Sequence, residues 1–188
     1  METVVGLFRR FEDADEAITA LENAGFNREA MSLLARNQVI DEIPRDRTAK
    51  EVAESAGVGA VGGGMVGGLL GLLAGLGAIA IPGIGPAIAV GALATALGGA
   101  GVGAAVGGIL GAMTALSIPE EEAHIYAEGV RRGNILVTVQ AAEEAQVDTA
   151  RSIMKNANAV DIETLRRELY KSGWQQFDET QPPDSNTL

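Results

Sequence analysis

The chain has 188 residues, with 14 Lys and Arg against 25 Asp and Glu, so its formal net charge is −11. It contains no Cys and one His, which excludes disulfides, thiolate metal sites and cysteine nucleophiles. The negative charge argues against a nucleic-acid partner, because phosphate binding requires a basic surface.

The first part of the chain has a β-α-β pattern. Residues 3–8 form a β-rich run, and residues 14–24 carry apolar side chains at helical spacing. Asp13 and Glu16 match a capping box, which predicts the start of this helix. Residues 31–35 then predict a second strand.

A long uncharged block follows. Residues 55–119 have no charged side chain, whereas residues 1–54 carry 7 basic and 12 acidic side chains (net −5) and residues 120–188 carry 7 and 13 (net −6). A turn divides the block into two apolar arms, 57–80 and 87–116, each long enough to span a bilayer as a helix of roughly 20 residues. The predicted turn residues are Pro82, Gly83, Gly85 and Pro86.

Small residues recur every four positions in both arms. This spacing lets two helix backbones approach closely, as helices do in lipid. An assembly of soluble subunits that buries the two arms between them is the alternative. The predicted packing and oligomerisation residues are Gly59, Gly63, Gly67, Gly71 and Gly75 in the first arm and Gly99, Gly103, Gly107 and Gly111 in the second, extended by Ala87, Gly91, Thr95 and Ala115.

The last part of the chain predicts α-β-α-β. A helix begins near Pro119 and ends at Arg131 and Arg132, a strand covers 134–139, a helix covers 143–156, and 159–162 predicts a short last strand. Two such β-α-β units pair commonly as a ferredoxin-like α+β sandwich. The fold expected is therefore α+β and ferredoxin-like, split by a long Gly/Ala-rich hairpin of two apolar helices.

The sequence pattern predicts four regions along the chain. Residues 1–47 are the first half of the ferredoxin-like domain, and residues 48–117 are the glycine-zipper hairpin with its turn at 81–86. Residues 118–165 are the second half of the domain, and residues 166–188 are a short helix with a flexible tail.

Several of these motifs resemble a family of small bacterial proteins, the general stress proteins (17M-like) or low-temperature-induced proteins. The similarity rests on residues 4–8, 81–86, 118–123, 129–133 and 136–139, and it covers nearly the whole chain to about residue 165. The resemblance implies a stress-associated, membrane-linked bacterial protein. It implies no substrate and no catalytic residues.

Three patterns allow chemistry, and each has a structural interpretation that we prefer. Residues 57–62 match G-x-G-x-x-G, but a helical run precedes them where a nucleotide site needs a strand. His124 could sense pH, although a lone His on an amphipathic helix is usually a packing or surface residue. Glu120, Glu121 and Glu122 could act as acid/base groups, but they also suit the first turn of a helix.

Two further groups could contact a membrane. The arginine pairs 131–132 and 166–167 could bind anionic head groups, or they could be solvated or stabilise helix C-termini. Trp174, with Phe177 and Tyr170, could be an interfacial anchor or a cap on the domain core. The residues alone leave both pairs of alternatives open.

The sequence therefore predicts a non-enzymatic, membrane-anchored homo-oligomer whose partner is the lipid bilayer, with no cofactor, metal or evident small-molecule substrate. The missing signal peptide places its acidic domain on the cytoplasmic side. The alternative is a soluble self-assembling protein, a filament or a shell, in the cytoplasm. A pore is disfavoured because only Thr95 and Thr114 could line it, and an enzyme because no polar groups converge.

Overall fold

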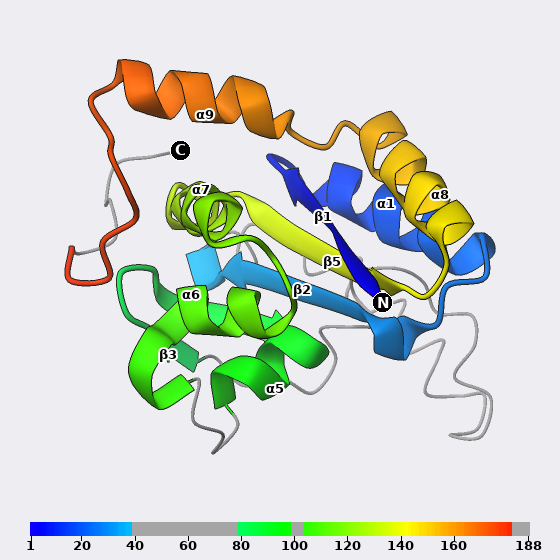
Figure 1. Cartoon of the computed structure of the whole chain (residues 1–188), viewed down its shortest axis with the longest axis horizontal. Coiled ribbons are helices and arrows are strands. Elements are labelled where there is room, and N and C mark those ends of the chain that lie inside the picture. Colours follow the sequence, from blue (N-terminus) through cyan, green and yellow to red (C-terminus); the bar gives the residue numbers. More distant parts are fainter. Residues whose placement is uncertain (39–78, 99–103, 182–188) are drawn as a thin grey trace.

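The computed structural model describes residues 1–38, 79–98 and 104–181. In these residues the chain is a mixed α+β fold in which a sheet lies between two layers of helices (Figure 1). The elements are β1 (Glu2–Phe8), α1 (Phe11–Asn23), η1 (Arg28–Ala30), β2 (Met31–Arg36), β3 (Ile79–Ile81), β4 (Gly85–Val90), α5 (Ala92–Gly98), α6 (Ala104–Ala115), α7 (Glu120–Arg131), β5 (Ile135–Ala141), α8 (Glu144–Asn156) and α9 (Ile162–Lys171).

The described strands form one sheet with the order β1-β5-β2-β4-β3, and every neighbouring pair is antiparallel. Val4 of β1 lies opposite Val139 of β5, and Leu33 of β2 lies opposite Val137. Because β1 and β2 are both antiparallel to β5, they run parallel to each other, and α1 is the crossover that parallel strands require. β4 extends the sheet on the far side of β2, with Ile88 opposite Ala35.

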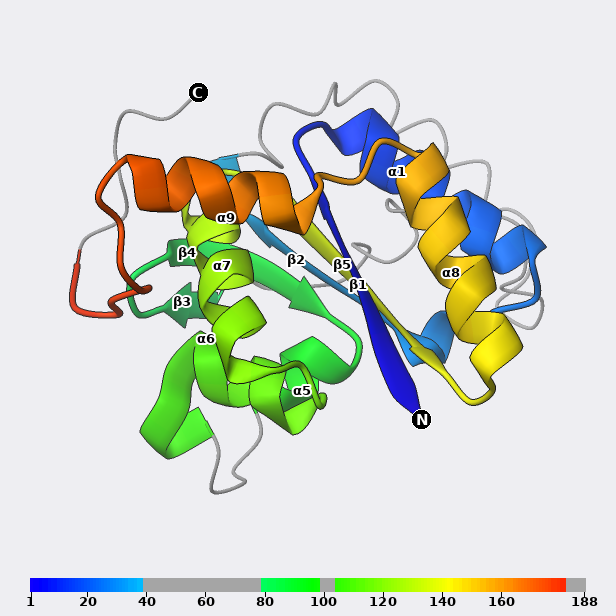
Figure 2. The same cartoon turned by 45° about the horizontal axis from the view of Figure 1, so that its top comes forward.

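The two faces of the sheet bury separate apolar clusters. Phe8 and Val137 belong to the cluster beneath α1 and α8, whereas their chain neighbours Leu7 and Leu136 belong to the cluster on the opposite face. This alternation is the two-residue period of a strand buried on both faces. Figure 2 shows α1 and α8 on one side of the sheet and α5, α6, α7 and α9 on the other.

The predicted α+β class is confirmed, but the predicted last strand at 159–162 is wrong. In this segment the Val160 N–H donates to the Leu7 carbonyl at 2.7 Å, and no ladder continues from that bond in the described residues. Asp161 instead caps α9, since its Oδ1 accepts a hydrogen bond from the Thr164 N–H at 2.7 Å. The cap ends the extended conformation before a strand can form.

The second arm of the predicted hairpin, 87–116, is also not a continuous helix. β3 and β4 form a β-hairpin, α5 follows after Gly91, and α6 contains a non-helical residue at Gly108 (φ 46°, ψ −135°). The physical reason is tertiary: β4 pairs with β2, and strand pairing outweighs the weak helix propensity of a Gly-rich run. Residues 57–78 of the first arm lie outside the described part of the chain.

Asp13 does not cap α1, as the sequence predicted, but joins two elements. Arg10 donates to its carboxylate through Nη2 and Nε, at 2.6 and 2.8 Å, and Asn158 after α8 donates at 3.1 Å. The hydrogen bonds from Arg10 hold the pKa of Asp13 below its usual value, although burial of the carboxylate opposes this shift. The ionised form of Asp13 therefore stabilises the contact between α1 and the end of α8.

We expect Asp13→Asn to lower the free energy of unfolding at pH 7 by about 1 kcal/mol, since Arg10 is largely exposed and solvent screens the pair. Because the folded pKa is depressed, this contribution is present above the unfolded value of about 3.9 and is lost as the pH falls through the folded pKa. Urea unfolding at pH 7 and at acid pH measures it. Asp148→Asn, an exposed position on α8, is the control; a constant deficit down to pH 2 would contradict the assignment.

Candidate functional site

The described half of the uncharged block is built into the sheet and its helical cover. We call β3, β4, α5 and α6 (79–98 and 104–115) the uncharged unit, because none of these residues is charged. Leu93 of α5 and Ile109 and Met113 of α6 are fully buried in the cluster that includes Leu34 of β2 and Leu136 of β5. The unit is therefore anchored in the core of the domain through one face of the sheet.

Two local contacts fix α5 on β2. The Leu93 N–H donates to Ser32 Oγ at 3.2 Å in the buried interior, which satisfies the first turn of the helix. Gly91, at φ +71°, turns the chain from β4 into α5, and a Cβ at this position would collide with the Met31 carbonyl oxygen. Gly91 is thus required by backbone conformation and close approach.

The outer face of α5 and α6 shows little polarity. Thr95 and Thr114 are exposed, but their hydroxyls donate to carbonyls one turn back in their own helices, Gly91 at 3.4 Å and Leu110 at 2.8 Å. The partly buried apolar residues of these two helices include Ala92, Ala94, Ala96, Leu97 and Leu110. This face consequently presents small apolar groups to its surroundings.

Only some of the predicted helix-packing residues lie in the described part of the chain. Gly107 and Gly111 lie in α6, and Ala87 is buried in β4 rather than on a helix. The predicted turn residues lie where β3 passes into β4, with Gly83 at φ +75° and Gly85 at φ +89°, so the chain reverses there between two strands. The packing residues outside the described ranges are Gly59, Gly63, Gly67, Gly71, Gly75, Gly99 and Gly103, and the G-x-G-x-x-G match at 57–62 is outside them too.

A buried ionic cluster lies beside this unit, at the end of α7. Glu128 is fully buried, and its Oε1 accepts from Arg131 Nη2 at 2.9 Å and from Arg132 Nε at 2.7 Å. Its Oε2 lies 2.8 Å from the same Nη2, as an ion pair without hydrogen-bond alignment. Arg36, at the end of β2, donates through Nη1 to the Arg131 carbonyl at 2.8 Å. The cluster ties α7 to the end of β2, a central strand of the sheet.

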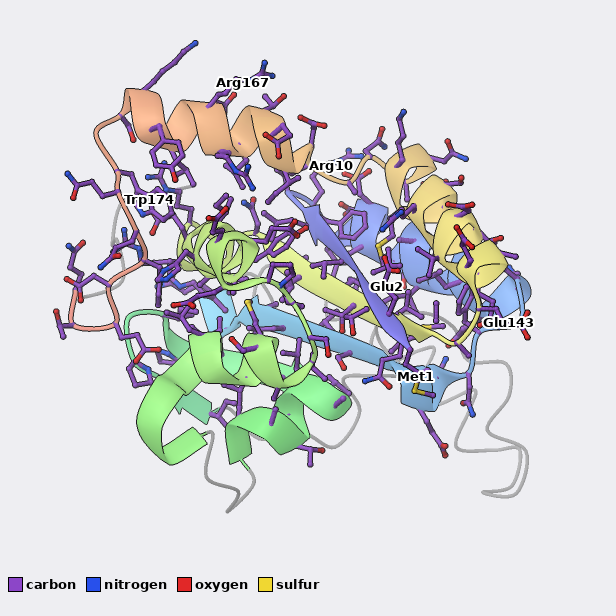
Figure 3. All side chains as sticks on the ribbon, viewed as in Figure 1. Met1, Glu2, Arg10, Glu143, Arg167 and Trp174 are labelled. Atoms are coloured by element: carbon purple, nitrogen blue, oxygen red, sulfur yellow. The ribbon has the colours of Figure 1, made fainter. Side chains whose placement is uncertain are left out.

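The chain after α9 covers the cluster. We call residues 174–181 the strap. Phe177 of the strap is 2% exposed, and the Arg131 guanidinium lies 5.9 Å from its ring centroid. Arg131 Nη1 also donates to Gln181 Oε1 at 3.1 Å. Figure 3 shows Trp174 at the start of the strap, and its ring lies 5.8 Å from that of Tyr170.

The predicted chemical residues do not come together with these groups. Glu120, Glu121 and Glu122 stand in the first turn of α7, where the helix dipole stabilises negative charge. His124 is half-buried one turn further on, and Tyr126 is buried, which raises the pKa of its phenol. Among the described residues, no group of His, Cys, Asp and Glu is arranged to hold a metal ion.

Comparisons with family models, with curated proteins and with solved structures found no match to this chain. Within the described part of the chain, none of the helices combines the length and the apolar character that a membrane crossing requires.

Sequence reasoning missed the buried role of two residues. Glu128 and Arg131 have the spacing of an ordinary solvated pair on a helix, but the apolar and small residues beside them in the sequence, 125–127 and 129–130, were a signal of burial. The aromatic side chains near the C-terminal end were predicted to be either a membrane anchor or a cap on the domain core. Phe177 is buried and therefore caps the core, whereas Tyr170 is 57% exposed.

Proposed function

We propose that this is a non-enzymatic, membrane-associated protein, with its α+β domain in the cytoplasm and its remaining uncharged run in contact with the bilayer. The observation that carries the proposal is the pairing of β2 with β4 and of β4 with β3. The segment 37–78 begins after β2 and ends before β3, so both of its ends belong to the same sheet. It must therefore cross a bilayer an even number of times or not at all.

The length of the uncharged run limits what such a segment can do. Between the two strands, the uncharged residues are 55–78, which is 24 residues. Two full spans require about 40 residues, so this run is too short for them. Two arms of about 12 residues reach roughly 18 Å as helices, which suits entry into one leaflet from the side of the domain. We propose this shallow insertion in place of a two-span hairpin.

The glycine row gives the proposed mode of self-association. Gly59, Gly63, Gly67, Gly71 and Gly75 all fall within residues 55–78. Helices in lipid associate through small residues at this spacing, so the inserted runs of several copies would form the homo-oligomer. The stress-associated role implied by the family resemblance is part of this proposal, as is the bilayer as partner.

We also propose a ferredoxin-like relationship for the domain. The order β1-β5-β2, with α1 joining the outer two and α8 after β5, corresponds to a split β-α-β unit. The fourth strand of that fold would lie beside β1, where the Val160 N–H meets the Leu7 carbonyl. On this interpretation the segment between β2 and α7 is an insertion, part of which extends the sheet.

A soluble self-assembling protein is the second candidate, and one observation favours it. Ile84, Leu93 and Met113 belong to the same uncharged block, yet they are buried in the protein core. A run of this composition can therefore be shielded from water by protein alone. In that case residues 55–78 would be buried between subunits.

Cell fractionation with an alkaline carbonate wash tests the proposal. We expect the full-length chain to pellet with membranes and to be released by detergent, because residues 55–78 contact lipid. Gly67→Leu should leave this partition unchanged but reduce the size of the detergent-solubilised oligomer, since a large side chain prevents close helix approach. Recovery in the wash as a large particle would contradict membrane association and support the soluble assembly.

A further inference from the structure

The strap contacts three separate parts of the fold. At the tip of the β3–β4 hairpin, a Cβ on Gly83 would lie 2.9 Å from both Glu179 Cα and the Phe177 ring. At the non-helical residue of α6, a Cβ on Gly108 would collide with the Glu179 carboxylate. At the end of α7, Arg131 contacts both Phe177 and Gln181. The strap thus closes over the junction between the uncharged unit and α7.

Phe177 is the most deeply buried apolar side chain of the strap, and Trp174 packs, partly buried, against the same cluster. Phe177 enters the cluster that contains Ile84, Met113 and Val130, and it is 2% exposed. Beyond Phe177, the side chains of the strap are half-buried or exposed. Asp178 and Thr180 bond to each other, Thr180 Oγ1 to Asp178 Oδ1 at 2.6 Å, so they order the strap without tying it to the domain.

Polar groups at the same interface are poorly satisfied. Within the described residues, five buried side-chain atoms on α7 and the strap have no hydrogen-bond partner: His124 Nδ1, Glu128 Oε2 (which is ion-paired with Arg131), Arg131 Nε, Trp174 Nε1 and Glu179 Oε1. Buried polar atoms are nearly always paired in folded proteins, and an unpaired one disfavours the closed state because opening returns it to water. The contact that seals this junction is therefore weaker than its apolar part alone would be.

We propose that the strap is a releasable latch, and that its opening uncovers an apolar surface with which the uncharged unit binds a bilayer. The surface consists of the Phe177 site, the hairpin tip and α6. It is continuous with the outer face of α5 and α6, whose threonine hydroxyls are already bonded within their own helices. This inference rests on the proposed membrane function and names the contact that regulates it.

Opening of the strap is expected to leave the rest of the domain folded. Release of Phe177 removes the cation–π contact with Arg131 and the packing against Gly83, whereas α7 and β5 keep their own buried contacts. Segments held by few buried apolar contacts open at lower free energy than the core. We therefore expect the amides of 175–181 to exchange at least about tenfold faster than those of α7 in the wild-type chain.

The test combines hydrogen exchange with vesicle flotation on the full-length chain. The variants are Phe177→Ala, the milder Gln181→Ala, which removes the side-chain bonds of Gln181 to Arg131 and to Asp178, and Phe11→Ala as the matched control, a phenylalanine packed against the cluster on the opposite face of the sheet. Vesicles of phosphatidylcholine with phosphatidylglycerol are the probe. Phe177→Ala should speed exchange in the strap and the hairpin tip and raise vesicle binding by about threefold or more. Gln181→Ala should act in the same direction, and Phe11→Ala should change neither the exchange of the strap nor vesicle binding.

Three outcomes would contradict the latch or the proposed membrane function. Strap amides that exchange only with global unfolding would overturn the latch. Vesicle binding by the wild type that neither Phe177→Ala nor Gln181→Ala raises would overturn the latch while leaving the membrane function in place. Absence of binding by every chain, Phe177→Ala included, would overturn the proposed function and with it the bilayer as the latch's partner.

Discussion

Gly91→Ala should lower the free energy of unfolding by about 3 kcal/mol or more, with no lipid present. Two effects add. A non-glycine residue at φ +71° costs roughly 1–2 kcal/mol, and the new Cβ would collide with the Met31 carbonyl oxygen, which belongs to a rigid strand. Because Met31 begins β2 in the middle of the sheet, the backbone there cannot move aside without breaking the ladder to β5. Urea denaturation of the purified chain measures the loss.

Gly98→Ala is the matched control for this substitution. Gly98 ends α5 in the same uncharged unit, and a Cβ there would meet no atom within 4 Å. We expect it to be neutral or to raise the free energy of unfolding by up to about 1 kcal/mol, because Ala favours a helix over Gly. Equal effects of the two substitutions would show that Gly91 has no special conformational role.

Gly91 also shows why the four-residue spacing of small residues predicted the structure of this block only in part. Ala87, Gly91 and Thr95 have the four-residue spacing of a helix-packing row. In the structure they lie in a strand, in a turn and in a helix, respectively. In the described part of the block, apolar side chains such as Leu93 and Met113 are shielded from water in the domain core. Whether lipid or protein excludes the water depends on the pairing of β4 with β2, a contact between residues far apart in the chain.

The elements with their own periodicity were more predictable. β1, α1, β2, β5 and α8 each carry a strand or helix pattern that tertiary contacts reinforce, so the α+β class followed from the sequence. The predicted strand at 159–162 failed because Asp161 has two competing roles, as a strand residue or as an N-cap, and the cap of α9 prevails.

The ionic cluster was not predicted, because its importance comes from burial, which the residue types and their spacing do not give. Arg132 and Glu128 have the same spacing as any exposed pair on a helix, and such pairs contribute little. Here Glu128 is fully buried and Arg131 is 6% exposed. Substitutions at this cluster should therefore have effects several times larger than those at an exposed ion pair.

Glu128→Gln is expected to lower the free energy of unfolding by about 3–5 kcal/mol. It removes the charge that compensates Arg131, whose side chain is 7% exposed, and leaves a guanidinium buried without its counter-ion. Glu168→Gln is the control, because Glu168 pairs with Arg9 at 3.9 Å while both side chains are more than half exposed. That substitution should cost less than about 0.5 kcal/mol. Thermal and urea unfolding of the two variants give the comparison.

The double variant Glu128→Gln/Arg131→Met separates charge from packing. If the loss in Glu128→Gln comes from the uncompensated guanidinium, removal of that guanidinium should recover most of the stability, because an apolar side chain can replace a buried ion pair at little cost. The same variant removes the contacts of Arg131 with Phe177 and Gln181, so the strap should exchange faster even as the domain regains stability. A double variant as unstable as Glu128→Gln would instead contradict the uncompensated guanidinium of Arg131 as the cause of the loss.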